Sequence, residues 1–256
     1  MIEERSIKID GLDVNYKIAG KGQPILILHG WGGTSASWTK VQELLSKKYL
    51  VVVPDLPGFG KTPSPPAGWS LERYVEFVEK FSQELNLGRI ILIGHSFGGR
   101  IAIQYAVKYP EELSYLILCA AAGIRHMRLR HKVLLIIAKS ANLIGSLPFI
   151  RRWRPHVRRL FYRAIKRTDY LEAEGVMKEI FLSVLSKNLR PILSSIKTST
   201  LVLWGEKDDF VPIEDANIMK QEIENAKLVI FPGIGHTPHK KIPDELVREI
   251  ETFLTK

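Results

Sequence analysis

The sequence has a single cysteine, Cys119, among its 256 residues, so an intramolecular disulfide is impossible. Cys119 lies in the apolar run 115–122, where a buried small side chain is favoured over a reactive thiol. The first five residues, MIEER, lack the apolar stretch of a secretory signal peptide. Because disulfides are rare in reducing compartments, these two absences predict a cytoplasmic protein.

Uninterrupted apolar runs of membrane-spanning length are also absent. The stretch 133–150 is strongly apolar, but four polar residues interrupt it: Lys139, Ser140, Asn142 and Ser146. A transmembrane span is therefore disfavoured.

The sequence contains no cofactor-binding or metal-binding motif with the residue spacing that such a motif requires. The segment GFGKT at 58–62 ends like a phosphate-binding loop, but Asp55 stands where that motif requires glycine. The seven histidines show no convincing metal-ligand spacing either. We therefore expect no cofactor and no metal ion.

What is present suffices for one sizeable α/β domain, since 45% of the residues are hydrophobic and no internal repeat occurs. Strand patterns occur at 6–10, 13–18, 24–28, 50–53, 90–93, 116–120, 201–204 and 228–231. Helical patterns occur at 38–48, 71–85, 98–109, 214–222 and 244–254. The first two strands read as an antiparallel hairpin. The later alternation predicts an eight-stranded, mostly parallel sheet with helices on both faces.

The segment Gly94-His95-Ser96-Phe97-Gly98 stands between a predicted strand and a predicted helix. Gly-x-Ser-x-Gly in that setting is typical of a nucleophile elbow, a tight turn that lifts one serine hydroxyl above the sheet. Side chains at the two glycine positions would collide with the neighbouring strand and helix. Ser96 is therefore the candidate nucleophile.

The candidate base is His236, which follows the last predicted strand on a glycine-containing loop, PGIGH at 232–236. Ligands and catalytic groups of parallel sheets gather at the carboxyl ends of strands, and His236 lies at such an end. His239 is the competing histidine. A solvent-exposed or lid-contacting role is favoured for it because prolines bracket it near the final helix.

The candidate acid is Asp208, which follows the strand at 201–204 and would orient the base. Asp209 is the second choice, and one of the two carboxylates could instead cap the next helix or bond within its own turn. The order Ser96, Asp208, His236 is that of α/β-hydrolases, whereas chymotrypsin-like and subtilisin-like proteases order these roles differently.

The oxyanion hole is predicted in HGWGG at 29–33, after the strand at 24–28. We expect the backbone N–H groups of Trp31 and Phe97 to be its donors. The alternative is a plain turn at the strand end. Five residues are expected to line the substrate pocket: His29, Gly30, Gly32, His95 and Phe210.

With these segments the chain resembles the α/β-hydrolase superfamily, in its lid-bearing branch of serine esterases, lipases and carbon–carbon bond hydrolases. The matching segments run in family order: HGWGG (29–33), PDLPGFG (54–60), GHSFGG (94–99), GEKD (205–208) and GH (235–236). Ser96 argues against haloalkane dehalogenases and most epoxide hydrolases, which carry aspartate at the elbow. Lys240 departs from the family, since many relatives have an acidic residue near that position.

The resemblance implies a core of residues 1–123 and 200–256 and a helical lid at 124–199. The lid segment carries 17 lysines or arginines against four acidic residues, whereas the whole chain has a net charge of +10. Three interpretations of this basic lid stay open. In the first, the basic side chains face solvent while the apolar faces of the lid helices pack over the pocket. In the second, the basic residues attract anionic lipid surfaces or acidic substrates. In the third and least favoured, they bind nucleic acid.

The expected function is hydrolysis of carboxylic esters with an apolar acyl group through an acyl-enzyme. Two alternatives stay open. One is a carbon–carbon bond hydrolase acting on diketone acids of the meta-cleavage type, which needs a ketone-bearing and usually carboxylated substrate. The other belongs to a different class, a ligand-binding relative whose catalytic residues are idle.

Overall fold

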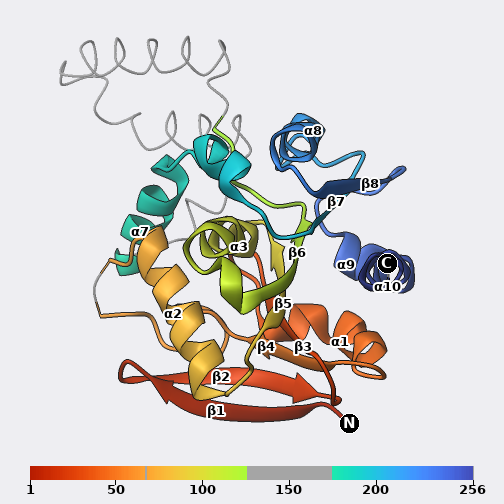
Figure 1. Ribbon diagram of the computed structural model, residues 1–256. Helices are drawn as coiled ribbons and strands as arrows, with labels where there is room; N and C mark the ends of the chain where they lie inside the picture. Colours follow the sequence, from red (N-terminus) through yellow and green to blue (C-terminus); the bar gives the residue numbers. More distant parts are fainter. Residues whose placement is uncertain (67, 126–174, 256) are drawn as a thin grey trace, which may run out of the picture.

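Eight short strands form one sheet at the centre of the fold (Figure 1). The structure is a computed structural model, and it describes residues 1–66, 68–125 and 175–255. In that part of the chain the strands are β1 (Glu3–Ile9), β2 (Leu12–Ala19), β3 (Pro24–Leu28), β4 (Leu50–Pro54), β5 (Ile90–His95), β6 (Leu113–Cys119), β7 (Thr200–Gly205) and β8 (Ala226–Phe231).

The strands lie in the order β1-β2-β4-β3-β5-β6-β7-β8. β2 runs antiparallel to β1 and to β4, whereas the pairings from β4 to β8 are parallel. The predicted α/β fold with an N-terminal hairpin and a mostly parallel sheet is therefore confirmed.

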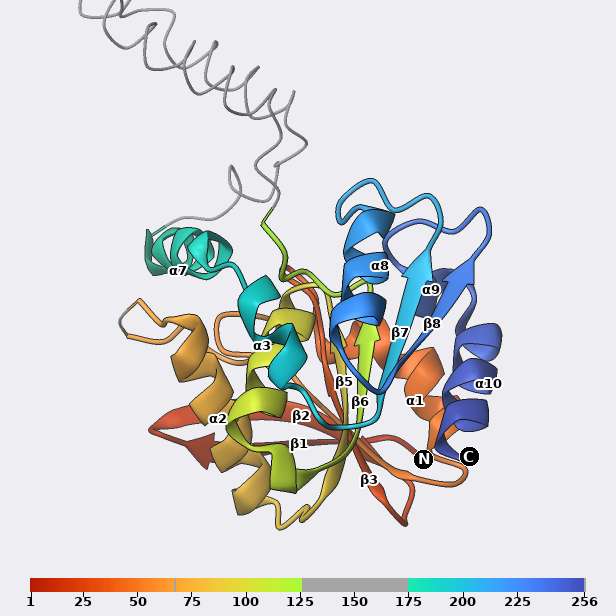
Figure 2. The same cartoon turned by 45° about the horizontal axis from the view of Figure 1, so that its top comes forward.

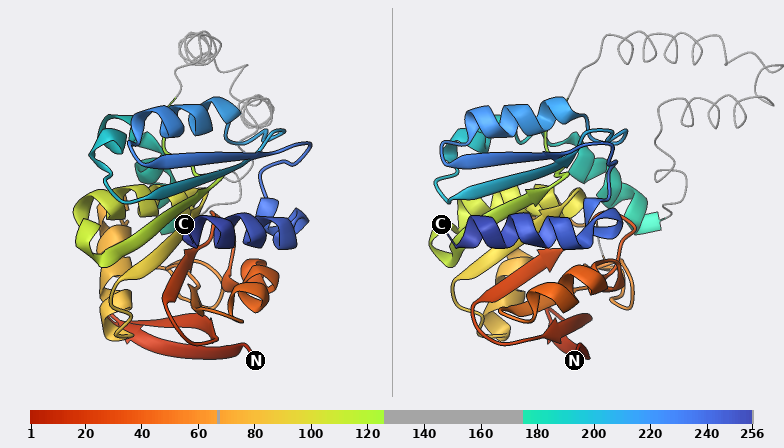
Figure 3. Two further views of the ribbon diagram at one scale, coloured as in Figure 1. Left: turned by 45° about the vertical axis from the view of Figure 1, so that its right-hand side comes forward. Right: turned by 90° about the vertical axis from the view of Figure 1, so that its right-hand side faces the viewer.

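Helices cover both faces of this sheet. The longer ones are α1 (Thr39–Leu45), α2 (Leu71–Glu84), α3 (Phe97–Lys108), α7 (Gly175–Ser186), α8 (Ile213–Glu222) and α10 (Pro243–Leu254). The short ones are η1 (Ser35–Trp38), η2 (Pro110–Glu112), η4 (Arg190–Ser195) and α9 (Pro238–Lys241). α2 and α3 lie on one face and α1 and α10 on the other, and Figure 3 shows α8 along β7 and β8.

The first helix is shorter than the sequence predicts. The expected helix at 38–48 is a 3-10 turn, η1, followed by α1, which ends at Leu45. The N–H groups of Lys48 and Tyr49 both bond back to the Leu45 carbonyl and turn the chain toward β4. The sequence also gave no signal for α9, whose first residue is a proline.

Side chains alternate along the central strands and so divide the buried residues into two cores. On β3, Leu26 and Leu28 belong to the core that includes α2 and α3, whereas Ile25 and Ile27 belong to the core that includes α1 and α10. Because helices cover both faces, these strands are buried on both sides. That is why they read as continuous apolar runs in the sequence.

The chain leaves the sheet at the end of β6 and re-enters it at β7. Residues 126–174 of this connection lie outside the described residues, so the lid assigned to 124–199 stays a prediction. In the described part, Ile180 and Val184 of α7 are buried in the core that includes α2 and α3. α7 lies near α2 (Figure 2), and just beyond its end Lys187 pairs with Glu72. This part of the insertion is therefore packed onto the core.

Asp55 fastens the loop that follows β4. Its carboxylate accepts hydrogen bonds from the N–H groups of Ser35 (2.6 Å) and Lys61 (2.9 Å) and from the Asn15 amide (3.0 Å). Burial by itself raises the pKa of Asp55, but these hydrogen bonds outweigh it and lower the pKa below its ordinary value. Gly60 is needed here, because a Cβ at its position would lie 2.3 Å from the carboxylate.

The junction between β5 and α3 is packed at backbone contact against the neighbouring strands. The Gly98 N–H donates to the His29 carbonyl at 3.1 Å, so the first turn of α3 lies directly on the end of β3. A Cβ on Gly99 would lie 2.4 Å from the Ala121 Cβ, on the other side. The elbow is therefore held between the chain segments that follow β3 and β6.

We expect Gly98→Ala to lower the free energy of unfolding by about 3 kcal/mol. The new Cβ would lie 2.3 Å from the Leu28 carbonyl oxygen and 2.8 Å from that of His29, and neither backbone atom can move cheaply. Gly235→Ala is the matched control, because its Cβ would meet the Lys207 oxygen at an ordinary 3.6 Å. Urea unfolding of both variants tests the close packing, and equally small losses would contradict it.

Candidate active site

Ser96 occupies a strained turn between β5 and α3. Its backbone has φ 50° and ψ −108°, and positive φ in a residue other than glycine typically costs about 1–3 kcal/mol. Hydrogen bonds on both sides hold this conformation: the Ser96 N–H donates to the Cys119 carbonyl (3.3 Å), and the Ala122 N–H donates to the Ser96 carbonyl (3.0 Å). Ser96 is half-buried, whereas the residues on either side of it in the elbow are buried. The turn therefore leaves this one residue accessible to solvent.

Asp208 and His236 come together through a direct hydrogen bond. The His236 Nδ1–H donates to Asp208 Oδ2 at 2.7 Å, and the carboxylate side chain is fully buried. Asp208 Oδ1 accepts the N–H groups of Phe210 (2.8 Å) and Val211 (2.9 Å), so both oxygens are engaged. With Nδ1 committed to Asp208, the Nε2 atom of His236 carries the lone pair. Asp209, the second choice for the acid, is exposed.

The loops that carry these two residues are joined along their length. The Glu206 N–H donates to the Phe231 carbonyl (3.0 Å), and the Lys207 N–H donates to the Ile234 carbonyl (2.8 Å). The Glu206 carboxylate also accepts the Gly233 N–H at 2.8 Å. These hydrogen bonds join the loop that carries the acid to the loop that carries the histidine.

The turn after β3 lies beside the elbow. A Cβ on Gly30 would lie 3.2 Å from the Ser96 Cβ, so the turn approaches the serine closely. The Gly33 N–H donates to the Gly30 carbonyl at 3.0 Å, and Gly32 supplies the positive φ of 68° that this turn needs. Within the described residues, the N–H of Trp31 makes no hydrogen bond to another backbone group, and Phe97, as the first residue of α3, has no partner within its helix.

The five residues expected in the pocket fall into different environments. His29 is fully buried; its Nδ1 lies 2.8 Å from the Gly30 carbonyl, and its Nε2 accepts the Leu56 N–H at 3.0 Å. Its ring therefore braces the loops and has no free nitrogen for a substrate. His95 is buried as well. Phe210 is 60% exposed, and its ring lies 5.1 Å from that of His236, so it borders the histidine.

Comparison with known proteins identifies the family. Residues 23–241 match the family model of the alpha/beta hydrolase fold, which is most of the chain. The chain belongs to this family.

Individual relatives are distant, and they include lipases and hydrolases of 2-hydroxy-6-oxo dienoates. The chain is 27% identical to Lipase 1 of Psychrobacter immobilis, covering 91% of this chain and 77% of that one. It is 26% identical to 2-hydroxy-6-oxo-2,4-heptadienoate hydrolase of Pseudomonas putida, covering 98% and 95%. Among solved structures, a membrane phospholipase A described as a bacterial virulence factor superposes with a TM-score of 0.79 at 26% identity, covering 99% of this chain and 86% of that one. These relatives support hydrolase activity.

Aromatic side chains of the hydrolase gather around Trp31. Its ring packs edge-on against the rings of three phenylalanines, with distances between ring centroids of 4.9 Å to Phe59, 5.3 Å to Phe97 and 4.8 Å to Phe181. Met177 of α7 reaches the same region, because a Cβ on Gly58 would lie 2.3 Å from its sulfur. The sequence did not point to Phe59, Phe181 or Met177 as site residues, because only the fold brings α7 to the loops after β3 and β4.

The described residues contain no group of three or more histidine, cysteine, aspartate or glutamate side chains that could hold a metal ion. No helix among them is long and apolar enough to cross a membrane. The cytoplasmic location expected from the sequence stays a prediction, because no observation tests it.

Three histidines around the site are buried in neutral form. Burial lowers the pKa of His29 to about 4, that of His95 to about 3 and that of His239 to about 2. Nearby His236 adds to the effect at His95, and His95 adds to it at His239. The two histidines that interact with His236, His95 and His239, are therefore uncharged.

These lowered pKa values predict that acid destabilises the fold well above the carboxylate range. Below about pH 6.5 the unfolded chain binds protons on these histidines and the native state does not, so the free energy of unfolding falls with pH. Each histidine contributes a slope of about 1.4 kcal/mol per pH unit. His239→Phe keeps an aromatic ring on Trp38 and should remove one such slope between pH 6.5 and 4.5. Urea unfolding across that range measures it, and an unchanged slope would contradict a buried neutral His239.

Proposed function

We propose that this hydrolase cleaves carboxylic esters through an acyl-enzyme, with Ser96 as nucleophile, His236 as base and Asp208 as the residue that orients the base. The observation that carries the proposal is the 2.7 Å hydrogen bond from His236 to the buried Asp208, on loops at the sheet edge where the strained Ser96 turn also lies. A buried carboxylate that fixes the tautomer of an imidazole leaves the far nitrogen free to accept a proton.

The reaction follows from these roles. Ser96 Oγ attacks the ester carbonyl while His236 Nε2 takes the hydroxyl proton, and a tetrahedral oxyanion forms. Its collapse breaks the bond to the alcohol oxygen, which receives the proton from His236. A water molecule then attacks the acyl-enzyme, again with His236 as base, and releases the carboxylic acid and free Ser96. One water is consumed for each ester cleaved.

The proposed oxyanion donors are the N–H groups of Trp31 and Phe97. Two observations support them: the β3 turn lies against Ser96, and Phe97 is the first residue of α3, where an N–H has no partner within the helix. The helix dipole adds a partial positive charge at this end of α3. Such preorganised donors are typically worth about 3–4 kcal/mol each in the transition state.

An apolar acyl group is the proposed specificity. The aromatic cluster of Trp31, Phe59, Phe97 and Phe181 adjoins both proposed oxyanion donors, so an acyl chain bound there would be surrounded by ring edges. Lipases among the relatives agree with this assignment. Contact of a basic lid with anionic lipid stays a prediction, because residues 126–174 of that segment lie outside the described residues.

A second candidate is hydrolysis of a carbon–carbon bond next to a ketone. Three relatives at 25–27% identity are named as hydrolases of 2-hydroxy-6-oxo dienoates, and the chain covers at least 91% of each. A panel of p-nitrophenyl esters of increasing chain length, assayed beside a meta-cleavage diketone acid, separates the two reactions.

Ser96→Ala should abolish ester hydrolysis and labelling by a fluorophosphonate probe, because both reactions require the activated hydroxyl. The expected loss in kcat is about 10⁴-fold or more. Rates with p-nitrophenyl butyrate and the mass of the labelled protein are the measurements. Full hydrolysis by the alanine variant would disprove the role of Ser96.

Asp208→Asn should lower kcat by about 10³–10⁴-fold, because an amide cannot stabilise the imidazolium and favours the wrong tautomer. Asp209→Asn is the matched control, as a change to the adjacent exposed carboxylate, and it should keep close to the parent rate. The two variants are compared by kcat and by urea unfolding. If the Asp209 variant lost more activity than the Asp208 variant, the assignment of the acid would be reversed.

A further inference from the structure

His95 ties the loop of His236 to the elbow. It is the last residue of β5 and directly precedes Ser96 in the chain. Its Nε2 lies 2.9 Å from the backbone carbonyl oxygen of His236. Because a carbonyl only accepts, the ring must carry its proton on Nε2 and donate it. The side chain of His95, the residue next to the proposed nucleophile, is therefore bonded to the backbone of the proposed base.

The ring of His95 packs against His239, which in turn stacks on Trp38. The centroids of the His95 and His239 rings lie 4.5 Å apart, with the ring planes at 60°. The centroids of His239 and Trp38 lie 4.3 Å apart, with the planes 7° from parallel. Trp38 is fully buried and His239 is 2% exposed. In the described part of the chain His239 Nδ1 and Trp38 Nε1 have no hydrogen-bond partner, so these nitrogens add no bond and the two rings support His95 by packing.

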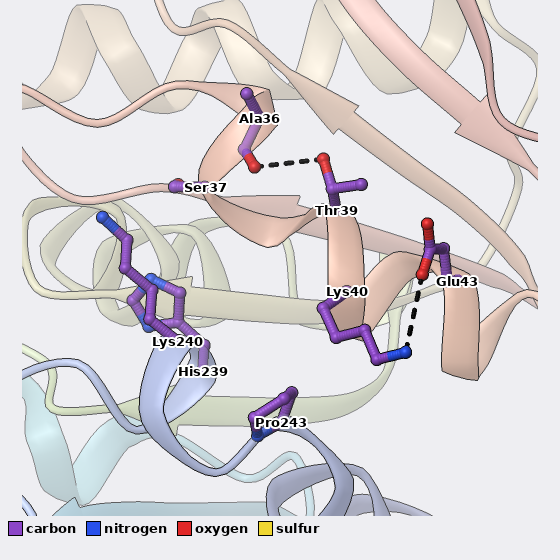
Figure 4. A pocket seen from close by; sticks show the side chains of 8 residues that line it. All are labelled: Ala36, Ser37, Thr39, Lys40, Glu43, His239, Lys240 and Pro243. Carbon is purple, nitrogen blue, oxygen red and sulfur yellow. Dashed lines mark hydrogen bonds and ion pairs between the residues drawn. The ribbon is translucent and has the colours of Figure 1, made fainter.

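The outer side of this stack is a groove between η1, α1 and α9, shown in Figure 4. Its lining residues are Ala36, Ser37, Thr39, Lys40, Glu43, His239, Lys240 and Pro243. His239 therefore lies between this groove and His95, and it separates the His95 ring from solvent on that side.

We propose that His95 is a positioning residue for His236, and that its Nε2–H holds the backbone of the histidine loop in the register that aims the imidazole at Ser96. This inference rests on the proposed function. His236 lies outside the regular helices and strands, between β8 and α9. The bond to Asp208 restrains its ring, but a ring held at one atom can still pivot. The bond from His95 to its carbonyl supplies the second point of restraint.

The chemistry of the donor matters as much as its position. A buried neutral imidazole donates a hydrogen bond without placing a second positive charge beside the imidazolium that forms on His236. A lysine or arginine at position 95 would donate equally well and repel that imidazolium. A misplacement of the base by about 1 Å can cost about 10²-fold in rate.

The test compares His95→Gln, which can keep a side-chain N–H donor, with His95→Leu, which removes the donor and keeps an apolar side chain of similar size. We expect the leucine variant to lose about 10–100-fold in kcat with little change in KM, and the glutamine variant to recover most of that loss. Thermal unfolding is measured for both. Equal kcat in the two variants, whether both high or both low, would overturn a role for the N–H donor.

A second readout does not depend on catalysis. The His236 Nδ1–H bonded to Asp208 should give a low-field proton NMR signal, assigned by its absence in His236→Gln. We expect this signal to persist in His95→Gln and to broaden through solvent exchange in His95→Leu. An unaltered signal in a folded His95→Leu variant would overturn the positioning role.

The two readouts separate the two hypotheses. If the wild-type protein hydrolyses no ester while the NMR signal still depends on His95, the proposed function fails and the positioning role stands. If esters are hydrolysed and His95→Leu matches the parent in both kcat and NMR signal, the positioning role alone fails.

Discussion

The left-handed turn at Ser96 is the constraint around which the site is arranged. A non-glycine residue adopts such a conformation only where its surroundings leave it no alternative, and here they are backbone atoms on both sides. The first turn of α3 bonds to the end of β3 through Gly98, and the Ser96 carbonyl accepts from Ala122 after β6. Contacts with the ends of three parallel strands, β3, β5 and β6, therefore fix the conformation of Ser96, and neither Asp208 nor His236 takes part in them.

Charge is distributed unevenly around that turn. Asp208 is a buried carboxylate with both oxygens engaged, whereas the imidazoles of His29, His95 and His239 are buried and neutral. An imidazolium formed on His236 would face one negative charge and no nearby histidine cation. The neutral rings therefore serve as hydrogen-bond donors, acceptors and packing surfaces. Asp208 is the group that would stabilise a positive charge on His236.

The sequence predicted the fold closely because the signals for it are local. Apolar runs, turn residues and helical periodicity predicted every strand and most of the helices, and the chain order predicted His236 as base and Asp208 as acid, with Asp209 as the second choice. It missed the end of the first helix at Leu45 and the short helix α9, whose limits depend on backbone hydrogen bonds rather than side-chain pattern. It predicted His29 only as a pocket-lining residue, because the bonds of its ring to Gly30 and to Leu56, 27 residues away, exist only in the folded chain.

By itself the sequence determined the α/β architecture, the elbow glycines and the chain order of serine, aspartate and histidine. These depend on residue type, spacing and the rule that parallel strands end at a common edge. Only the tertiary structure decided which of two adjacent aspartates bonds His236, which aromatic rings surround Trp31, and that His95 bonds the carbonyl of a residue 141 positions away. Those contacts join segments with no sequence relation to one another, so they exist only once the strands have been ordered side by side in the sheet.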